Sequence, residues 1–140
     1  MLAQNFKSAD SLNLTEDEFN AMVTVLGMFE REEVQYRSAE RADTCRGIPD
    51  TFEPRSFNMR FFAGADDCGT VACICGWAEY VGRLPAGSLM EKRLSFPYLD
   101  RLFDPTGYFN YDQITIANAA AALRNYLTFG EPRWDEVMAP

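Results

Sequence analysis

Residues 68–80 read Cys68-Gly69-Thr70-Val71-Ala72-Cys73-Ile74-Cys75-Gly76-Trp77-Ala78-Glu79-Tyr80, and this stretch decides the fold. It holds three of the four cysteines, and residues 68–78 carry no charge. After Thr70 the apolar residues recur at the three- and four-residue spacing of one helix face, and the opposite face is apolar too. We therefore expect a buried helix that starts near Gly69 and Thr70 and ends at Gly82, where a residue with positive φ would close the last turn.

A helix over this stretch would keep its cysteines apart. Cys73 and Cys75 would sit about 200° apart around the axis. Cys68 would lie roughly 10 Å from Cys75 along the axis, beyond the ~7 Å limit between the Cα atoms of a disulfide. One straight helix also cannot surround zinc, and the spacing C-x4-C-x-C matches no common zinc pattern. We expect buried, reduced thiols and no metal site. Cys68 is the one candidate catalytic residue, because a helix start would lower the pKa of its thiol.

Gly76 is an unusual residue for the interior of a helix. It disfavours the helix by roughly 1 kcal/mol relative to alanine. A close approach by a neighbouring element would compensate for this cost. The four alanines at residues 119–122 offer a second face without bulk. We therefore predict that Gly76 packs against this alanine-rich face of the last helix.

The segment Cys-Gly-Thr-Val-Ala-Cys-Ile-x-Gly-Trp-Ala, preceded by Phe57-Asn58-Met59, resembles one that recurs in small uncharacterised proteins of bacteria and their phages. The alanine-rich region from Ala119 to Trp134, which ends in Gly130-Glu131-Pro132-Arg133-Trp134, is similar to the same group. The resemblance implies a cytoplasmic origin and no particular reaction. Cys75 stands where the group leads us to expect alanine or glycine, and this departure argues against a fixed thiol role at that position.

The composition is that of a folded, acidic protein. A chain of 140 residues that is 47% hydrophobic, with 11 Phe, predicts a single domain over residues 1–140. Its 13 basic and 21 acidic residues give a net charge of −8. This charge disfavours binding to nucleic acid or to an anionic membrane, and it permits a basic partner. The first ten residues lack a signal-peptide pattern and no apolar run approaches ~18 residues, so we expect a cytoplasmic protein without a membrane span.

The first helix has a clear start signal, and the last helix has clear start and stop signals. Thr15 and Glu18 form a capping-box pattern at the start of the first helix. Thr115 is placed to cap the last helix, and Gly130 followed by Pro132 ends it, with Trp134 holding the tail. A short helix from about Ser95 would turn three side chains inward, namely Leu99, Leu102 and Phe103.

The rest of the chain has weaker patterns. Residues 30–56 are polar and read as a loop, which is the second candidate for a binding surface. Residues 57–61 alternate like a short strand, and residues 82–90 read as a loop. The expected fold is mainly α, a compact single-domain bundle of about four helices to which one short strand or hairpin could be added.

The motifs that are missing guide the functional hypothesis. The chain has no histidine, which removes Ser–His and Cys–His pairs and histidine-ligated metals. It also lacks the glycine motifs that bind nucleotides, so no cofactor is expected. The leading hypothesis is a non-catalytic cytoplasmic accessory protein that binds a protein partner or another copy of itself, without nucleic acid or membrane. One alternative is a thiol-dependent enzyme that uses Cys68, and another is an acidic mimic of nucleic acid.

Overall fold

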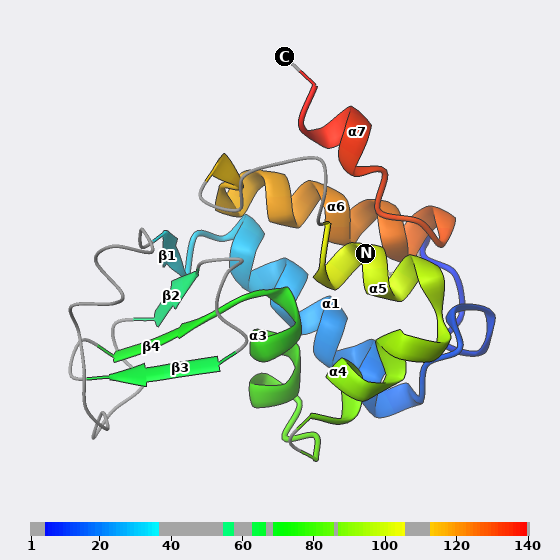
Figure 1. The fold of residues 1–140 in the computed structure, drawn as a ribbon, viewed down its shortest axis with the longest axis horizontal. Helices are drawn as coiled ribbons and strands as arrows, with labels where there is room; N and C mark the ends of the chain where they lie inside the picture. The colour runs from blue at the N-terminus through cyan, green and yellow to red at the C-terminus, as the bar shows by residue number, and fades with distance from the viewer. Residues whose placement is uncertain are drawn as a thin grey trace.

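A computed structural model describes residues 5–36, 55–57, 63–66, 69–85, 87–105 and 113–139. The described part is mainly helical, as the sequence predicts (Figure 1). Its α helices are α1 (Glu16–Glu30), α3 (Ile74–Val81), α4 (Ser88–Lys92), α5 (Pro97–Phe103), α6 (Ile116–Phe129) and α7 (Trp134–Val137). Short 3-10 helices are η2 (Asp10–Leu12) and η3 (Arg93–Ser95), and the strands are β1 (Gln35–Tyr36), β2 (Arg55–Phe57), β3 (Ala63–Asp66) and β4 (Gly69–Ala72).

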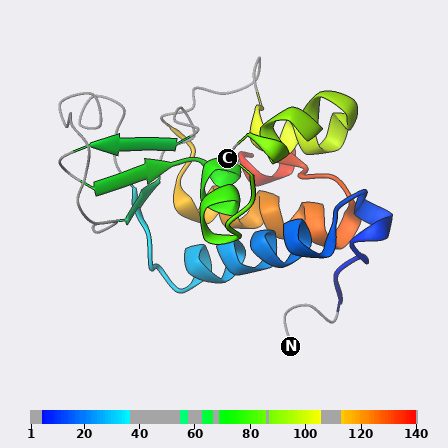
Figure 2. The ribbon, with the colours of Figure 1, turned by 90° about the horizontal axis from the view of Figure 1, so that it is seen from below.

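Helix α1 lies at the centre of the packing. It contacts both α3 and α6, and the remaining helices pack onto these three (Figures 1 and 2). Its inner side chains Met22, Val25 and Leu26 are completely buried. The described helices include none with the length and apolar character needed to cross a lipid bilayer.

The predicted start of α1 and both predicted ends of α6 are confirmed. The Glu18 backbone N–H donates to Thr15 Oγ1 at 3.1 Å, and the Thr15 N–H donates to Glu18 Oε1 at 2.9 Å. These two bonds satisfy amides that a helix start leaves without an intrahelical partner. Thr115 caps α6 in the same way, and Gly130 ends α6 with a φ of 84°. The short helix α5 also forms where predicted, with Pro97 in its first turn and with Leu99, Leu102 and Phe103 buried.

The prediction for residues 69–73 is wrong. Residues 69–72 form strand β4, and the helix begins only at Ile74, with Cys73 in an extended conformation just before it. Thr70 and Val71 are β-branched and favour strands, and β4 has a partner on each side. Backbone pairing with β2 and with the adjacent hairpin strand β3 therefore prevails over the local helical spacing. The predicted angle between Cys73 and Cys75 does not apply, because Cys73 precedes the first helical residue.

The strands form one small sheet with the order β1-β2-β4-β3. β3 and β4 make the antiparallel hairpin that the fold prediction allowed for, while β2 pairs parallel with β1 and β4. The sheet lies to one side of the helices (Figures 1 and 2). Residues 35–36 and 55–56 are therefore strand rather than loop, which corrects part of the prediction for residues 30–56. Residues 37–54 and 58–62 lie outside the described ranges.

Gly82 marks a close approach of α3 to α1. Its φ is −82°, so the predicted positive φ is wrong. A Cβ added to Gly82 would lie only 2.5 Å from the Cβ of Ala21. Glycine is therefore required here for space. Gly76 is buried inside α3. The principal helix contacts of α3 are with α1, α4 and α5 rather than with α6, and the pairing of Gly76 itself stays a prediction.

We expect Gly82→Ala to lower the free energy of unfolding by about 1–3 kcal/mol, because α1 and α3 must separate to admit the new methyl group. The measurement is urea denaturation of the folded chain. Gly27→Ala is the matched control. A Cβ there would meet Arg31 Nη1 at 2.8 Å, the movable end of a long side chain, so the variant should gain up to about 1 kcal/mol from helix propensity. A Gly82→Ala variant as stable as the parent chain would contradict the close approach.

Candidate functional site

The thiols near the start of α3 are buried and poorly suited to nucleophilic chemistry. Cys73 and Cys75 are both buried thiols. Burial raises the pKa of the Cys73 thiol to about 11. Burial, followed by the proximity of Cys73 and Glu79, raises the pKa of Cys75 further still. A nucleophilic cysteine needs the opposite shift. Cys68, the candidate catalytic residue, lies outside the described residues.

Glu79 is a buried carboxylate that the sequence analysis missed. Its side chain accepts hydrogen bonds from the backbone N–H groups of Gly87, Leu89 and Met90, the last two at 2.9 and 3.1 Å. The Cys75 thiol donates a weaker bond to the same carboxylate, with 3.8 Å between sulfur and oxygen. Glu79 thereby caps the first turn of α4 from another helix. Residues 88–90 are therefore helical, so the prediction of a loop over residues 82–90 is wrong for this part.

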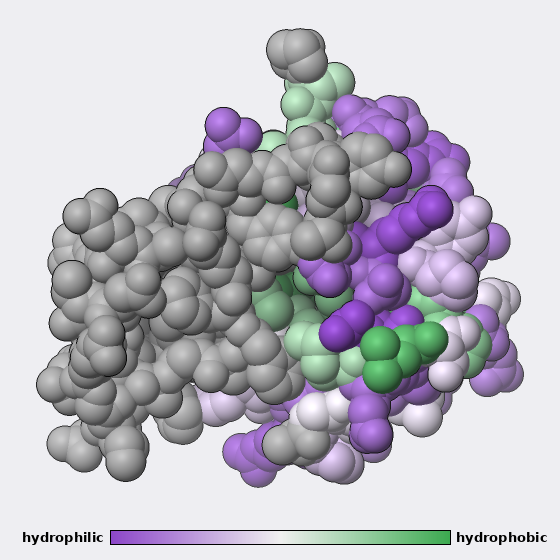
Figure 3. Space-filling model, in the orientation of Figure 1, coloured by the Kyte–Doolittle hydropathy of each residue, from purple (hydrophilic) through white to green (hydrophobic). Residues whose placement is uncertain are grey.

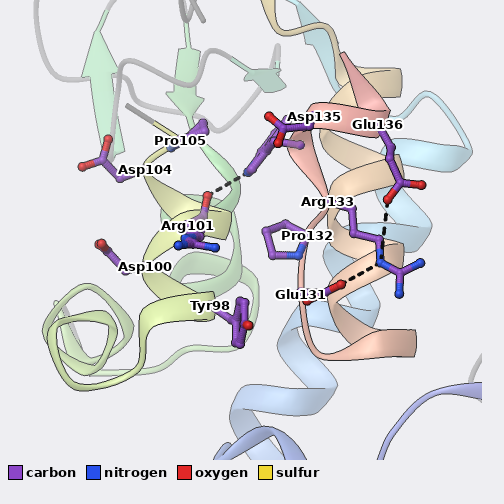
Figure 4. A pocket seen from close by; sticks show the side chains of 11 residues that line it. Tyr98, Asp100, Arg101, Asp104, Pro105, Glu131, Pro132, Arg133, Asp135 and Glu136 are labelled. Atoms are coloured by element: carbon purple, nitrogen blue, oxygen red, sulfur yellow. Dashed lines mark hydrogen bonds and ion pairs between the residues drawn. The ribbon is translucent and has the colours of Figure 1, made fainter. Parts of the chain in front are cut away.

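A groove between α5 and the segment that leads into α7 is the best candidate for a binding site (Figure 4). We call it the α5–α7 groove. Its volume is about 420 Å³, within the roughly 300–1,000 Å³ that is usual for ligand sites. It is lined by Tyr98, Asp100, Arg101, Asp104, Pro105, Glu131, Pro132, Arg133, Trp134, Asp135 and Glu136.

Three features of the chain hold the two walls of the groove in place. Gly130 ends α6 with a φ of 84°, and Arg133 adopts a second left-handed conformation with a φ of 55°, so the chain turns back toward α5. The Trp134 Nε1–H donates to the carbonyl oxygen of Arg101 at 2.7 Å and joins the walls directly. Trp134 is 5% exposed, which confirms its predicted role in holding the tail. Pro132 is buried on the segment before α7, and its ring points toward α5 (Figure 4).

The groove is acidic overall. Five carboxylates and two guanidinium groups line it, which gives a net charge of −3. Asp100 pairs with Arg93 at 2.6 Å, and Glu131 pairs with Arg133 at 2.9 Å. Asp135 is exposed and forms no hydrogen bond or ion pair with the described part of the chain. Its carboxylate is therefore available to a ligand.

Aromatic rings beside the groove are also accessible. Tyr98 is 47% exposed, and the guanidinium carbon of Arg101 lies 5.6 Å from its ring centroid. Arg133 covers the ring of Phe129 at 3.9 Å. The wider surface on the face drawn in Figure 3 is mainly hydrophilic in its described part, with a hydrophobic patch. An accessible ring beside an acidic groove favours a ligand that is both cationic and partly apolar.

A second groove, of about 830 Å³, lies between the end of α1 and α6. Its walls include Phe29, Val34 and Ile116, and its Arg124 forms two bonds with Glu30, at 2.9 and 2.7 Å. Because that guanidinium and that carboxylate satisfy each other, this groove has less polar chemistry to offer a ligand. Across the described ranges, no three His, Cys, Asp or Glu side chains are grouped so that they could hold a metal ion.

Comparison of the chain with protein-family models, curated proteins and solved structures finds no match.

We expect Glu79→Gln to destabilise the protein by about 1–3 kcal/mol, because the amide cannot replace a carboxylate that accepts three backbone bonds. Chemical denaturation measures the effect. Glu91→Gln is the control, since Glu91 is exposed on α4, the helix that Glu79 caps, and it should change stability by less than about 0.5 kcal/mol. Equal effects of the two substitutions would show that the buried bonds contribute no special stability.

We expect Cys73 and Cys75 to react slowly with an aromatic disulfide reagent while the protein is folded. The test uses the variant Cys45→Ser/Cys68→Ser, in which only these two thiols remain. A rise in pKa from 9.0 to about 11 cuts the thiolate fraction of Cys73 at pH 8 about a hundredfold, and burial slows access further. The same variant in concentrated urea supplies the fast reference rate. A folded-state rate equal to that reference for either thiol would contradict the burial.

Proposed function

We propose that this protein is a non-catalytic cytoplasmic accessory protein that binds a basic segment of a partner protein in the α5–α7 groove. The observation that carries this proposal is the net charge of −3 in a groove whose buried lining residues are Pro105, Pro132 and Trp134. A lysine or arginine side chain combines an apolar stem with a cationic head, and this groove offers a surface for each part. That the protein belongs with the small bacterial and phage proteins that it resembles stays a prediction.

Charge favours a basic partner over a second copy of the chain. The whole protein carries a net charge of −8, so two copies repel each other. The same charge attracts a basic segment and raises its rate of encounter at low salt. The partner therefore supplies the positive charge, and we expect its binding to weaken as the salt concentration rises.

The raised pKa values of Cys73 and Cys75 disfavour thiol chemistry at these two residues, whereas Cys68 lies outside the described ranges. Glu79, the buried carboxylate beside them, is committed to the backbone of α4. These groups have structural partners and are closed to solvent, whereas the polar groups of the α5–α7 groove face outward.

The test uses a fluorescent peptide in which arginine and lysine alternate with glycine, and it measures fluorescence anisotropy with the full chain. We expect Asp135→Asn/Glu136→Gln to weaken binding roughly threefold to tenfold, because two groove charges are lost at a partly solvated site. The control is Glu16→Gln/Asp17→Asn, which changes the net charge equally in the first turn of α1, outside the groove. Equal weakening by both variants would assign the attraction to the overall charge and contradict the groove.

A further inference from the structure

The arginines of the α5–α7 groove show which cation its surroundings accommodate. Arg101 and Arg133 come from opposite walls, and each places its guanidinium over an aromatic ring, Tyr98 and Phe129 respectively. Guanidinium groups are planar and stack on aromatic faces, whereas the ammonium of lysine is a compact, strongly hydrated charge. Two contacts between a guanidinium and an aromatic ring, made by different elements, indicate that this part of the surface can bind a guanidinium group.

Arg101 differs from Arg133 in how firmly its side chain is held. Arg133 has ion pairs with Glu131 and Glu136 in addition to its ring contact. Within the described residues, the guanidinium of Arg101 has the Tyr98 ring and no ion pair. The backbone of Arg101 is fixed by the bond from Trp134, so its exposed side chain can leave the ring without disturbing the walls.

We propose that the groove selects an arginine of the partner, whose guanidinium takes the place of the Arg101 guanidinium on the Tyr98 ring. This inference rests on the proposed function and names the side chain that the groove recognises. Arg101 then occupies the site in the unbound protein and competes with the ligand. Asp135 lies toward the other end of the groove in Figure 4, where its carboxylate receives a second basic residue of the same segment.

The proposal predicts a preference for arginine over lysine. A cation over an aromatic ring at an exposed site contributes about 0.5–1 kcal/mol, so the ring can favour arginine over lysine by at most about twofold to fivefold in affinity. It also predicts that one substitution within the groove increases the binding affinity. Removing Arg101 should strengthen binding, because it frees the ring and leaves the groove more negative.

The experiment compares three labelled peptides of equal length, in which glycine alternates with arginine, with lysine or with citrulline. We expect the arginine peptide to bind about twofold to fivefold more tightly than the lysine peptide, and the neutral citrulline peptide to bind least. Tyr98→Leu should abolish the preference for arginine, while Tyr98→Phe should retain it. Circular dichroism of each variant checks that the helices are intact.

Arg101→Gln tests the competition. It should raise the affinity for the arginine peptide at least twofold. Arg31→Gln is the control with the same change in net charge, because Arg31 is exposed, pairs with Glu33 and lies outside the groove. Equal affinity for the arginine and lysine peptides would overturn this inference and leave the proposed function standing. Equal gains from both arginine variants would overturn the competition, and no binding of either cationic peptide would overturn the proposed function as well.

Discussion

The contact of α1 with both α3 and α6 is the constraint on which the rest of the structure depends. The three helices share a core in which Met22, Trp77 and Leu123 are completely buried. Large apolar side chains contribute about 1.5–3 kcal/mol each when fully buried, so this core supplies most of the drive for folding. The shorter helices α4, α5 and α7 are placed by their contacts with α3 and α6, and their positions follow from this core.

The elements that could be predicted from the sequence are those with local signals. The Thr15–Glu18 capping box, Pro97 at the start of α5 and Gly130 after α6 each act within a few residues, so their geometry can be read from spacing alone. Strand β4 could not be predicted in this way. Its partners are β2 and the hairpin strand β3, and this pairing leaves no periodic signature in a stretch of small residues.

The same limit explains why the candidate site was missed. The walls of the α5–α7 groove come from segments about thirty residues apart, and neither Tyr98 nor Asp135 belongs to a motif. Trp134 was expected to hold the tail, but its acceptor, the carbonyl of Arg101, is visible only in three dimensions. Glu79 was missed for a related reason, because the amides that donate hydrogen bonds to its carboxylate lie beyond an intervening turn.

The role of Glu79 has a consequence for the motions of the chain. Helix α4 spans only Ser88–Lys92, which is too short to persist without external support. Its first turn is held by a side chain of α3, so the amide protons of Leu89 and Met90 are shielded for as long as that side chain stays in place. Exchange of these protons with solvent deuterium then requires the first turn of α4 to separate from the Glu79 carboxylate. A single side chain of α3 therefore controls how readily α4 opens to solvent.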